Sequence, residues 1–527
     1  MGLLSGDRGV KATLLARHPQ FFGRFVDAEA FLLAIDATRT LSCVVRDGNI
    51  MMMGAPRSVK TVFEYIDYLR KTIACSARAC ATVVLCFDDP RHVPPAKSLT
   101  QSRRDDASKR RAASKARKGA PDGASVEGLE EGGDAQAATP PPVAPAAPID
   151  FTADDLSAVA DCHDLVDDRA TRYRFFDELV KRALCEPHTF LPPNTMVVVE
   201  GVDTRGASRP MASERFPSVV CVANVAALGD SQVADVPMDT DVPTDADTEI
   251  APRTNAQRVA LDASTPPIPV DEFGQCPLTA NVGEADFKVC RLADACAEAM
   301  GAESVVMIDT VDTDILPIAL LNDCHSRRLG DRGDWSCASR GRVYVGIRER
   351  GKKAAQALWK QSGVETLVPD EVKASAGWLI VDIDDLTRSI CADMHSGPSP
   401  MHDNDAFVRC ALLCASWAMC GCDYVPENIN AADAVHDEAL GVLCGLDRTT
   451  SISAMRFFTD GSRAFPSEDL VDTLGRIASG ASGALTRGKS KDTLARLPRD
   501  VALKALWSAA YWLDPCNWPA MLIDYGY

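Results

Sequence analysis

Residues 304–314 read Ser304-Val-Val-Met-Ile-Asp-Thr-Val-Asp-Thr-Asp314. The short apolar run at its start is typical of a buried parallel strand, and acidic residues follow that run closely. Two other runs have the same form, because residues 31–35 precede Asp36 and residues 82–87 precede Asp88. Ligands of open α/β sheets bind beyond the carboxyl ends of the strands, so we expect these acids to converge on one site.

Strands and helices alternate along most of the chain. Apolar runs indicate further strands at 196–199, 219–222, 343–347 and 378–381. Periodicity and composition indicate helices at 58–79, 96–118, 151–185, 284–300 and 405–422. This alternation predicts an α/β fold with a doubly wound, mostly parallel sheet flanked by helices.

Two stretches of biased composition predict disordered insertions. Residues 119–150 are rich in Gly, Ala and Pro, and residues 229–270 are rich in Asp, Pro and Thr, so neither can bury enough apolar surface to become ordered. The predicted parts are an N-terminal α/β part (1–118), a disordered linker (119–150), a continuation of the α/β core (151–228), an acidic disordered linker (229–270), an internal α/β part (271–427) and a helical C-terminal region (428–527).

The charge of the chain is large and uneven. A net charge of −18 over 527 residues argues against a surface that coats nucleic acid in general. Residues 97–118 nevertheless contain nine basic and two acidic residues, whereas residues 229–252 contain seven acids and no Lys or Arg. We expect the first segment to contact phosphates, although a solvated helix face is the commoner role of such a run. The piece from Lys109 to Lys118 is also similar to a nuclear-localisation signal.

Cysteine content and hydropathy bear on the environment of the chain. Nineteen cysteines without repeated spacing predict a reducing intracellular compartment, and no apolar run approaches the roughly 20 residues of a membrane span. The cysteines at 410, 414, 420 and 422 suggest a zinc site, but their spacing and apolar surroundings favour buried thiols. His163 and His188 are predicted to be ordinary core or surface histidines.

Acids that converge at one edge require compensation. Two like charges about 4 Å apart repel by roughly 4 kcal/mol at an effective dielectric constant near 20. Either some carboxyl groups stay protonated, or divalent cations lie among them, and oxygen ligands suit Mg²⁺ or Mn²⁺ best. Asp423 follows the end of the apolar helix predicted at 405–422, where the helix dipole disfavours a carboxylate unless a cation is near. Its position favours a ligand role.

Six short motifs occur in a fixed order along the chain. They are Met1-Gly-Leu-Leu4, Ala34-Ile-Asp-Ala37, Phe87-Asp88, Gly283-Glu-Ala-Asp286, Asp312-Thr-Asp314 and Gly421-Cys-Asp-Tyr424. This set resembles the flap endonuclease and XPG superfamily of 5′ nucleases, whose catalytic domain is PIN-like. The resemblance covers residues 1–426 in patches. It implies a PIN-like sheet and a nuclease domain that is formed by the α/β parts of the chain.

The resemblance also implies site residues. The metal ligands would be Asp36, Asp88, Glu284, Asp286, Asp312, Asp314 and Asp423, which would hold two Mg²⁺ ions, with Mn²⁺ as a substitute. Lys97 and Arg104 would contact the scissile phosphate, and Gly2 would lie near the active site. The activity implied is a structure-specific 5′ nuclease that cuts flapped or branched DNA by a two-metal mechanism, in nuclear DNA repair or replication.

Some features depart from that family. Residues 425–430 replace its Gly-rich helix-turn-helix, and the C-terminus shows no recognisable sliding-clamp motif. The herpesviral host-shutoff ribonucleases belong to the same superfamily, and their motif is similar to Val311-Asp-Thr-Asp-Ile315. An alternative is therefore an endoribonuclease that degrades mRNA, which would place the chain in the cytoplasm. A third possibility is a catalytically silent PIN-like scaffold that binds nucleic acid.

Overall fold

A single sheet organises the chain. The computed structural model describes residues 9–25, 40–89, 91–92, 161–167, 169–203, 217–224, 266–272, 274–329, 340–348, 378–395, 401–422, 425, 429, 431–460, 465–481 and 499–515. In these residues eight strands pair in the order β1-β8-β7-β6-β2-β3-β4-β5. Their bounds are β1 (Phe22–Phe25), β2 (Thr40–Asp47), β3 (Thr82–Cys86), β4 (Thr195–Asp203), β5 (Pro217–Asn224), β6 (Ser304–Thr310), β7 (Arg342–Arg348) and β8 (Trp378–Asp382).

The middle of the sheet is parallel. Strands β7, β6, β2, β3 and β4 run in one direction, whereas β8 and β5 are antiparallel to their neighbours β7 and β4. The inner strands β3 and β6 are buried over their whole length, as expected for strands covered on both faces. The predicted α/β fold with a mostly parallel sheet flanked by helices is therefore confirmed.

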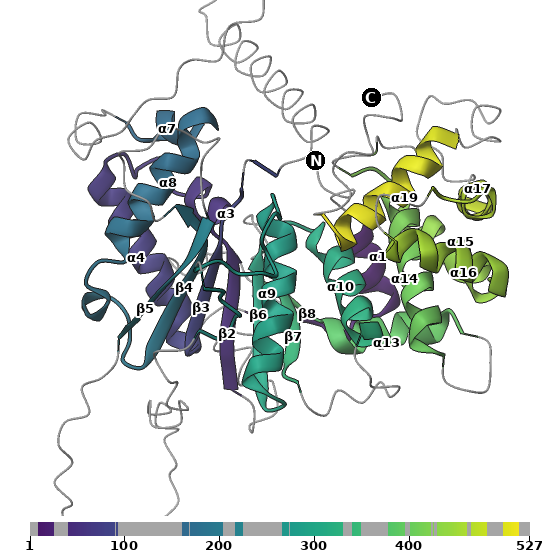
Figure 1. Ribbon diagram of the computed structural model, residues 1–527, viewed down its shortest axis with the longest axis horizontal. Helices are drawn as coiled ribbons and strands as arrows, with labels where there is room; N and C mark the ends of the chain where they lie inside the picture. The colour runs from purple at the N-terminus through teal and green to yellow at the C-terminus, as the bar shows by residue number, and fades with distance from the viewer. Residues whose placement is uncertain are drawn as a thin grey trace, which may run out of the picture.

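Helices cover both faces of the sheet (Figure 1). One face carries α3 (Gly48–Met53), α4 (Val62–Ala79), α7 (His163–Asp167) and α8 (Arg169–Ala183), and the other carries α9 (Ala285–Met300). Alternate residues of the strands serve the two cores, because Val44 packs with the α4 side and Val45 with the α9 side. Helix α4 begins after a capping box in which the Thr61 side chain and Glu64 satisfy each other's backbone N–H groups.

The predicted helical C-terminal region is confirmed. It contains α15 (Ala432–Cys444), α16 (Arg448–Thr459), α17 (Glu468–Gly480) and α19 (Arg499–Leu513). These helices pack around the apolar helix α14 (Asp403–Ala418), together with α10 (Ile315–Leu329) and α13 (Ile383–Asp393), beside the sheet (Figure 1). Helix α1 (Val10–Arg17) packs against α15. Their buried residues belong to the same apolar cluster as those of α9. Two short 3₁₀ turns, Pro19–Phe21 and Pro187–Thr189, complete the described elements.

Several predicted elements differ from the structure. The strand predicted at 31–37 and the helix predicted at 96–118 lie outside the described residues, as do residues 119–150 and most of 229–270. The central strand β2, at Thr40–Asp47, was not predicted at all. One long helix was predicted over 151–185, where the described residues form α7 and α8 instead.

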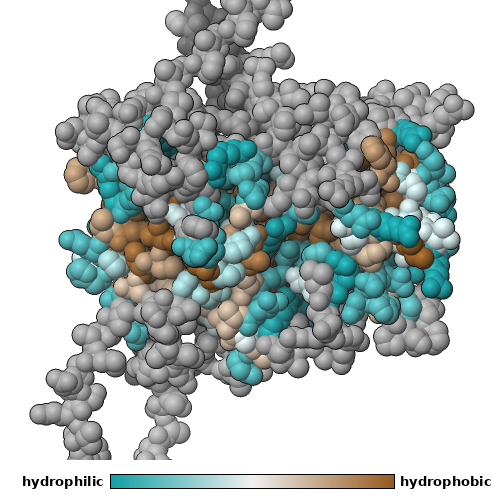
Figure 2. All heavy atoms as spheres, in the orientation of Figure 1, coloured by the Kyte–Doolittle hydropathy of each residue, from teal (hydrophilic) through white to brown (hydrophobic). Residues whose placement is uncertain are grey.

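The described surface is mixed in character. Figure 2 shows apolar residues gathered near β4 and β5 and a mostly hydrophilic surface over the C-terminal helices. Within the described part of the chain, no helix is both long and apolar enough to cross a membrane.

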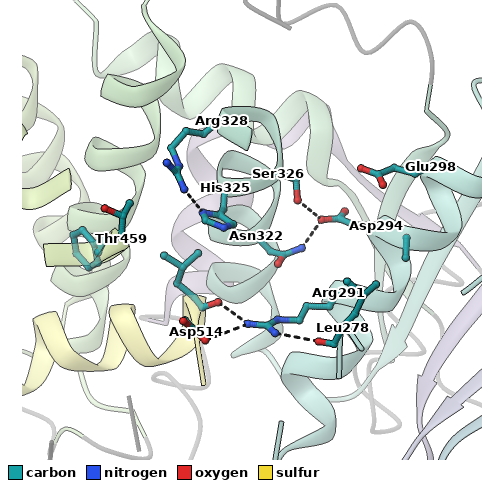
Figure 3. Close-up of a pocket in the computed structure, with 13 residues that line it drawn as sticks. Leu278, Arg291, Asp294, Glu298, Asn322, His325, Ser326, Arg328, Thr459 and Asp514 are labelled. Carbon is teal, nitrogen blue, oxygen red and sulfur yellow. Dashed lines mark hydrogen bonds and ion pairs between the residues drawn. The ribbon is translucent and has the colours of Figure 1, made fainter. Parts of the chain in front are cut away.

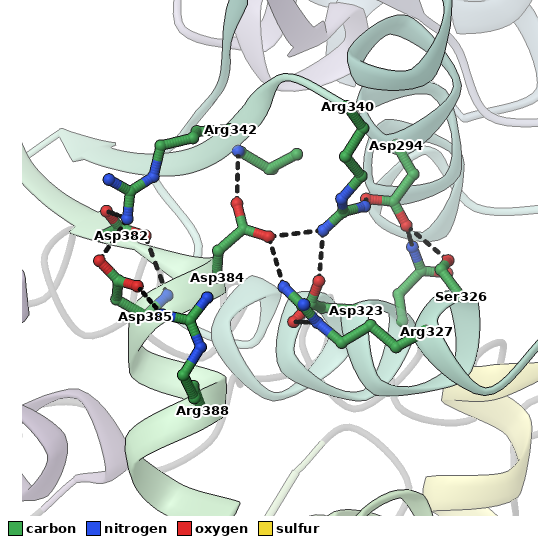
Figure 4. A network of polar contacts seen from close by, with 12 residues as sticks. Asp294, Asp323, Ser326, Arg327, Arg340, Arg342, Asp382, Asp384, Asp385 and Arg388 are labelled. Carbon is green, nitrogen blue, oxygen red and sulfur yellow. Dashed lines mark hydrogen bonds and ion pairs between the residues drawn. The ribbon is translucent and has the colours of Figure 1, made fainter. Parts of the chain in front are cut away.

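A buried ionic network fastens α9, α10, β7 and α13 together (Figure 4). Arg340 reaches Asp294 at 3.1 Å and Asp384 at 2.6 Å, and it also contacts Asp323. Arg327 donates to Asp384 at 2.7 Å. Burial alone would raise the pKa of Asp384, but Arg340 and Arg327 hold it below its usual value. Because Arg340 precedes β7, this network lies at the amino edge of the parallel strands.

A pair of buried histidines makes stability depend on pH. His436 is fully buried, stacks on Trp417 with ring centroids 5.7 Å apart, and lies edge-on to His18 at 6.0 Å. Neither ring nitrogen of His436 has a hydrogen-bond partner among the described residues. Burial, with help from His18 and Arg17, lowers the pKa of His436 to about 4. Burial also lowers the pKa of His18, although Asp393 opposes that shift.

Acidification from pH 6.5 to about 4 should therefore destabilise the fold. The unfolded chain binds the proton near pH 6.5 while the folded chain resists it, so stability is complete above that pH and falls below it. His436 alone should remove about 3 kcal/mol over this range, measured by urea unfolding at several pH values. A His436→Leu variant should show a correspondingly shallower fall, whereas the exposed His188→Gln variant should follow the parent chain. An equal fall in the parent and the His436→Leu variant would contradict this assignment.

Candidate metal site at the carboxyl edge of the sheet

The loop after β3 is joined to the start of α9. The Asp88 carboxylate accepts a hydrogen bond from the backbone N–H of Ala285 at 2.8 Å, and the Asp89 N–H donates to the Gly283 carbonyl at 2.7 Å. Glu284 is the N-cap residue of α9 and Asp286 lies in its first turn. Three predicted ligands, Asp88, Glu284 and Asp286, thus lie at one junction, although their positions in the sequence are almost 200 residues apart. The helix dipole stabilises negative charge there.

Glu284 receives a partner from the C-terminal region. Its side chain is buried, and the Tyr511 hydroxyl on α19 donates to Oε1 at 3.2 Å. Tyr511 is itself fixed by stacking on Trp507 and by an edge-on contact with Phe287, with centroids 4.9 and 5.0 Å apart. A buried carboxylate requires such partners. The role of α19 at this site could not be seen in the sequence, because no local motif marks Tyr511.

Asp312 and Asp314 follow β6 at the same edge of the sheet. The Asp312 N–H donates to the Thr310 hydroxyl at 3.0 Å, and the Asp314 N–H donates to Asp312 Oδ1 at 3.0 Å. This turn leads directly into α10, which begins at Ile315. Since β6, β2 and β3 are parallel neighbours, Asp312 and Asp314 lie beyond the carboxyl end of β6 at the same edge as Asp88, which follows β3.

Asp47 is an acid of this edge that was missed. It ends β2, the strand between β3 and β6, and lies opposite Cys86 in the register of β3. Asp47 is 7% exposed, and its side chain caps α3 by accepting from the N–H groups of Asn49 and Ile50, at 2.7 and 3.1 Å. Every second residue of a strand points to the same face of the sheet, and Cys43 and Val45 point to the face that carries α9. Asp47 is next in this alternation and therefore lies on that face.

An ion pair explains why β2 was difficult to recognise. Arg46 lies inside the strand, although it is charged, because its Nε contacts Asp309 of β6 at 2.9 Å on the α4 face. Arg348 of β7 binds the same carboxylate through two hydrogen bonds of 2.7 and 2.6 Å. These contacts fix the register of three adjacent strands. The sequence signal that could have found Asp47 is the apolar run before it and the Gly48-Asn49 pair after it.

A second buried ion pair supports the site near the start of α9. Lys288 lies one turn into α9 and is fully buried, and its Nζ contacts Glu200 of β4 at 3.0 Å and the Phe87 carbonyl at 2.9 Å. The Thr279 hydroxyl donates to the same carboxylate at 2.9 Å. The charges are therefore paired and hydrogen-bonded, as burial requires. Lys288 thus fastens α9 to the strand that leads to Asp88.

The structure does not describe the remaining predicted site residues. Asp36, Asp423, Lys97, Arg104 and Gly2 are all outside the described residues. Within the described ranges, no group of three or more His, Cys, Asp or Glu side chains already has the geometry to hold a metal ion.

The structure also tests the predictions for the cysteines and the histidines. Of the four cysteines predicted to be buried, Cys410, Cys414 and Cys420 are buried, whereas Cys422 is partly exposed. His163 is a buried core histidine whose Nδ1 lies 2.9 Å from the Tyr65 hydroxyl, and His188 is exposed.

Comparison with known proteins adds no family assignment. No protein-family model matches the chain, and no curated protein matches it significantly. The resemblance to the 5′ nucleases therefore rests on the motifs and on the positions of their acids.

Proposed function

We propose that this chain is a divalent-metal-dependent nuclease with a PIN-like sheet. The observation that carries the proposal is the hydrogen bond from the Ala285 N–H to Asp88, which joins the acid that follows β3 to the start of α9, where Glu284 and Asp286 flank Ala285 in the sequence. Asp47, Asp312 and Asp314 lie along the same carboxyl edge. An open α/β sheet binds its ligands at this edge.

The donor set suits a hard cation. All six described acids offer carboxylate oxygens, which Mg²⁺ and Mn²⁺ prefer. Repulsion among acids at one edge favours cation binding, because each close pair without a counter-ion costs about 4 kcal/mol. Two ions among these carboxylates, with Asp36 and Asp423 as further ligands, would fit the motif resemblance.

The residues of the chain would have separate roles. Bound ions would supply activation of a water nucleophile and stabilisation of the leaving oxygen. The Ala285 N–H orients Asp88, the Tyr511 hydroxyl orients Glu284, and the Asp314 N–H orients Asp312. Such contacts tune and position ligands. Lys97 and Arg104 would contact the scissile phosphate, and Gly2 would lie near it.

The first substrate that we propose is a 5′-flapped or branched DNA, acted on in the nucleus. A second candidate, a capped mRNA in the cytoplasm, is favoured by the segment after α14. Val425 and Ile429 are buried there, and the Cys422 N–H donates to the Val425 carbonyl at 2.9 Å. These two residues are buried at the position where the DNA-cutting family has a Gly-rich module that binds duplex DNA.

One assay separates the candidates. The purified chain would receive Mg²⁺ or Mn²⁺ with a labelled 5′-flap DNA and, separately, with a capped RNA. Cleavage of the flap alone supports the DNA nuclease, and cleavage of RNA alone supports the ribonuclease. Binding of either substrate without metal-dependent cleavage would contradict the nuclease proposal and leave the silent scaffold. An Asp472→Asn variant, which changes an exposed acid of α17, is the matched control and should cut normally.

A further inference from the structure

A pocket of about 470 Å³ opens between α9, α10, α16 and α19 (Figure 3). Arg328 and His325 lie on one side of the pocket and Glu298 on the other, with Arg291 and Asp514 below. We propose that this pocket binds a mononucleotide, with its phosphate at Arg328. The nucleotide is either free or one unit of a nucleic-acid strand, and only the second case rests on the proposed nuclease function.

Arg328 is a half-buried cation without a described counter-ion. Its Nε is buried and has no hydrogen-bond partner among the described residues, and its Nη2 lies 3.4 Å from His325 Nδ1. The guanidinium stacks over Phe407 at 5.1 Å, and burial lowers its pKa. Partial burial of an uncompensated charge is costly, so an anion at the pocket wall would stabilise it. A planar guanidinium suits the oxygens of phosphate.

His325 can add a neutral donor beside this cation. Burial, with Arg328 and Arg291 nearby, lowers the pKa of His325 to about 4, so the ring is neutral near pH 7. Since its Nδ1 faces the Arg328 donor, the proton of the neutral ring belongs on Nε2. That N–H is available to a phosphate oxygen.

The other wall suits a nucleoside. Asp294 is held by Arg340, by the Ser326 hydroxyl at 2.9 Å and by the Asn322 amide, so the Asn322 carbonyl oxygen keeps acceptor capacity. Glu298 is exposed at the rim and offers further acceptors to sugar hydroxyls or base amino groups. Apolar surface for a base comes from Leu278, Phe458 and Leu513. The lining therefore combines apolar surface with placed polar groups, as small-molecule sites do.

The pocket and the candidate metal site share the helices α9 and α19. Arg291 lies on α9, two turns after Glu284, and donates to the Leu513 carbonyl on α19 at 3.1 Å. Tyr511 of the same helix contacts Glu284. A strand whose phosphate reached the acids could therefore place another of its nucleotides in the pocket.

Calorimetric titration of the full chain with adenosine 5′-monophosphate, in EDTA, tests the assignment. We expect binding of one nucleotide, weakened about tenfold or more in Arg328→Ala, because a hydrogen bond to a charged group is lost. Thr459→Trp should block the pocket at its rim, and Arg456→Ala, which removes an exposed charge from the outer side of α16, should bind as the parent does. Adenosine and inorganic phosphate should each bind about tenfold more weakly. Absence of binding, or equal binding of phosphate, overturns the proposal.

Two further arms separate the sources of the nucleotide. A single-stranded oligonucleotide that displaces adenosine 5′-monophosphate identifies a strand as the ligand, whereas undisturbed nucleotide binding identifies a free nucleotide. The titration is repeated with Asp88→Asn, which should bind the nucleotide normally. Since EDTA and this variant remove the metal site, the titration does not depend on nuclease activity. Nucleotide binding by a parent chain that cuts neither substrate in Mg²⁺ or Mn²⁺ would reject the nuclease and keep the pocket. Nuclease activity without nucleotide binding would reject the nucleotide pocket and keep the nuclease.

Discussion

Asp88→Asn should lower metal-dependent cleavage by about a thousand-fold or more while leaving the fold intact. Asparagine has nearly the same shape, and its carbonyl oxygen can still accept from the Ala285 N–H, so the junction between β3 and α9 is kept. The negative charge that would hold a cation is lost. The measurement is kcat on the substrate that the parent chain cuts, with circular dichroism as the check on folding and Asp472→Asn as the control.

Asp47 and Asp36 can be compared in the same assay. Asp47 ends the central strand, and Asn caps helices as well as Asp does, so Asp47→Asn should also abolish cleavage without unfolding α3. A large loss in Asp36→Asn together with full activity in Asp47→Asn would show that Asp47 only caps the helix. Full activity in Asp88→Asn would reject the site as a whole.

Lys288→Met should lower the free energy of unfolding by about 3–5 kcal/mol, because it leaves Glu200 buried without its cation. The Phe87 carbonyl and the Thr279 hydroxyl cannot replace a positive charge. Urea unfolding at pH 7 measures the change, and the exposed Lys71→Met variant on α4 should unfold almost as the parent chain does.

A double variant tests whether the effect comes from the pair. Adding Glu200→Gln to Lys288→Met removes the unpaired charge, so part of the lost stability should return. If Lys288→Met changed stability by less than about 1 kcal/mol, the pair could not be fastening α9 to β4 as we describe.

The sequence predicted the elements whose signals are local. β3 and β6 each contain an uninterrupted apolar run, and both were found, together with the acids that follow these runs. The helix α14 was recognised for the same reason, since it is almost entirely apolar and is buried. For these elements, type and order therefore followed from composition and periodicity alone.

The features that were missed depend on distant partners. Arg46 breaks the apolar pattern of β2, and only Asp309, far along the chain, makes its burial possible. In the same way, Tyr511 meets Glu284 and Lys288 meets Glu200 through packing of separate elements. A single sequence carries no local sign of such pairs, so the central strand, its acid and the support of the site were not predicted.

Metal uptake is the most direct test of the central claim, that acids at the carboxyl edge of the sheet hold divalent cations. Calorimetric titration of the metal-free chain with Mn²⁺ should show saturable binding of two ions. Binding should be lost or strongly weakened when Asp88 and Asp312 are both replaced by Asn, and retained in Asp472→Asn. Absence of saturable uptake, or equal uptake by the double variant, would contradict the account.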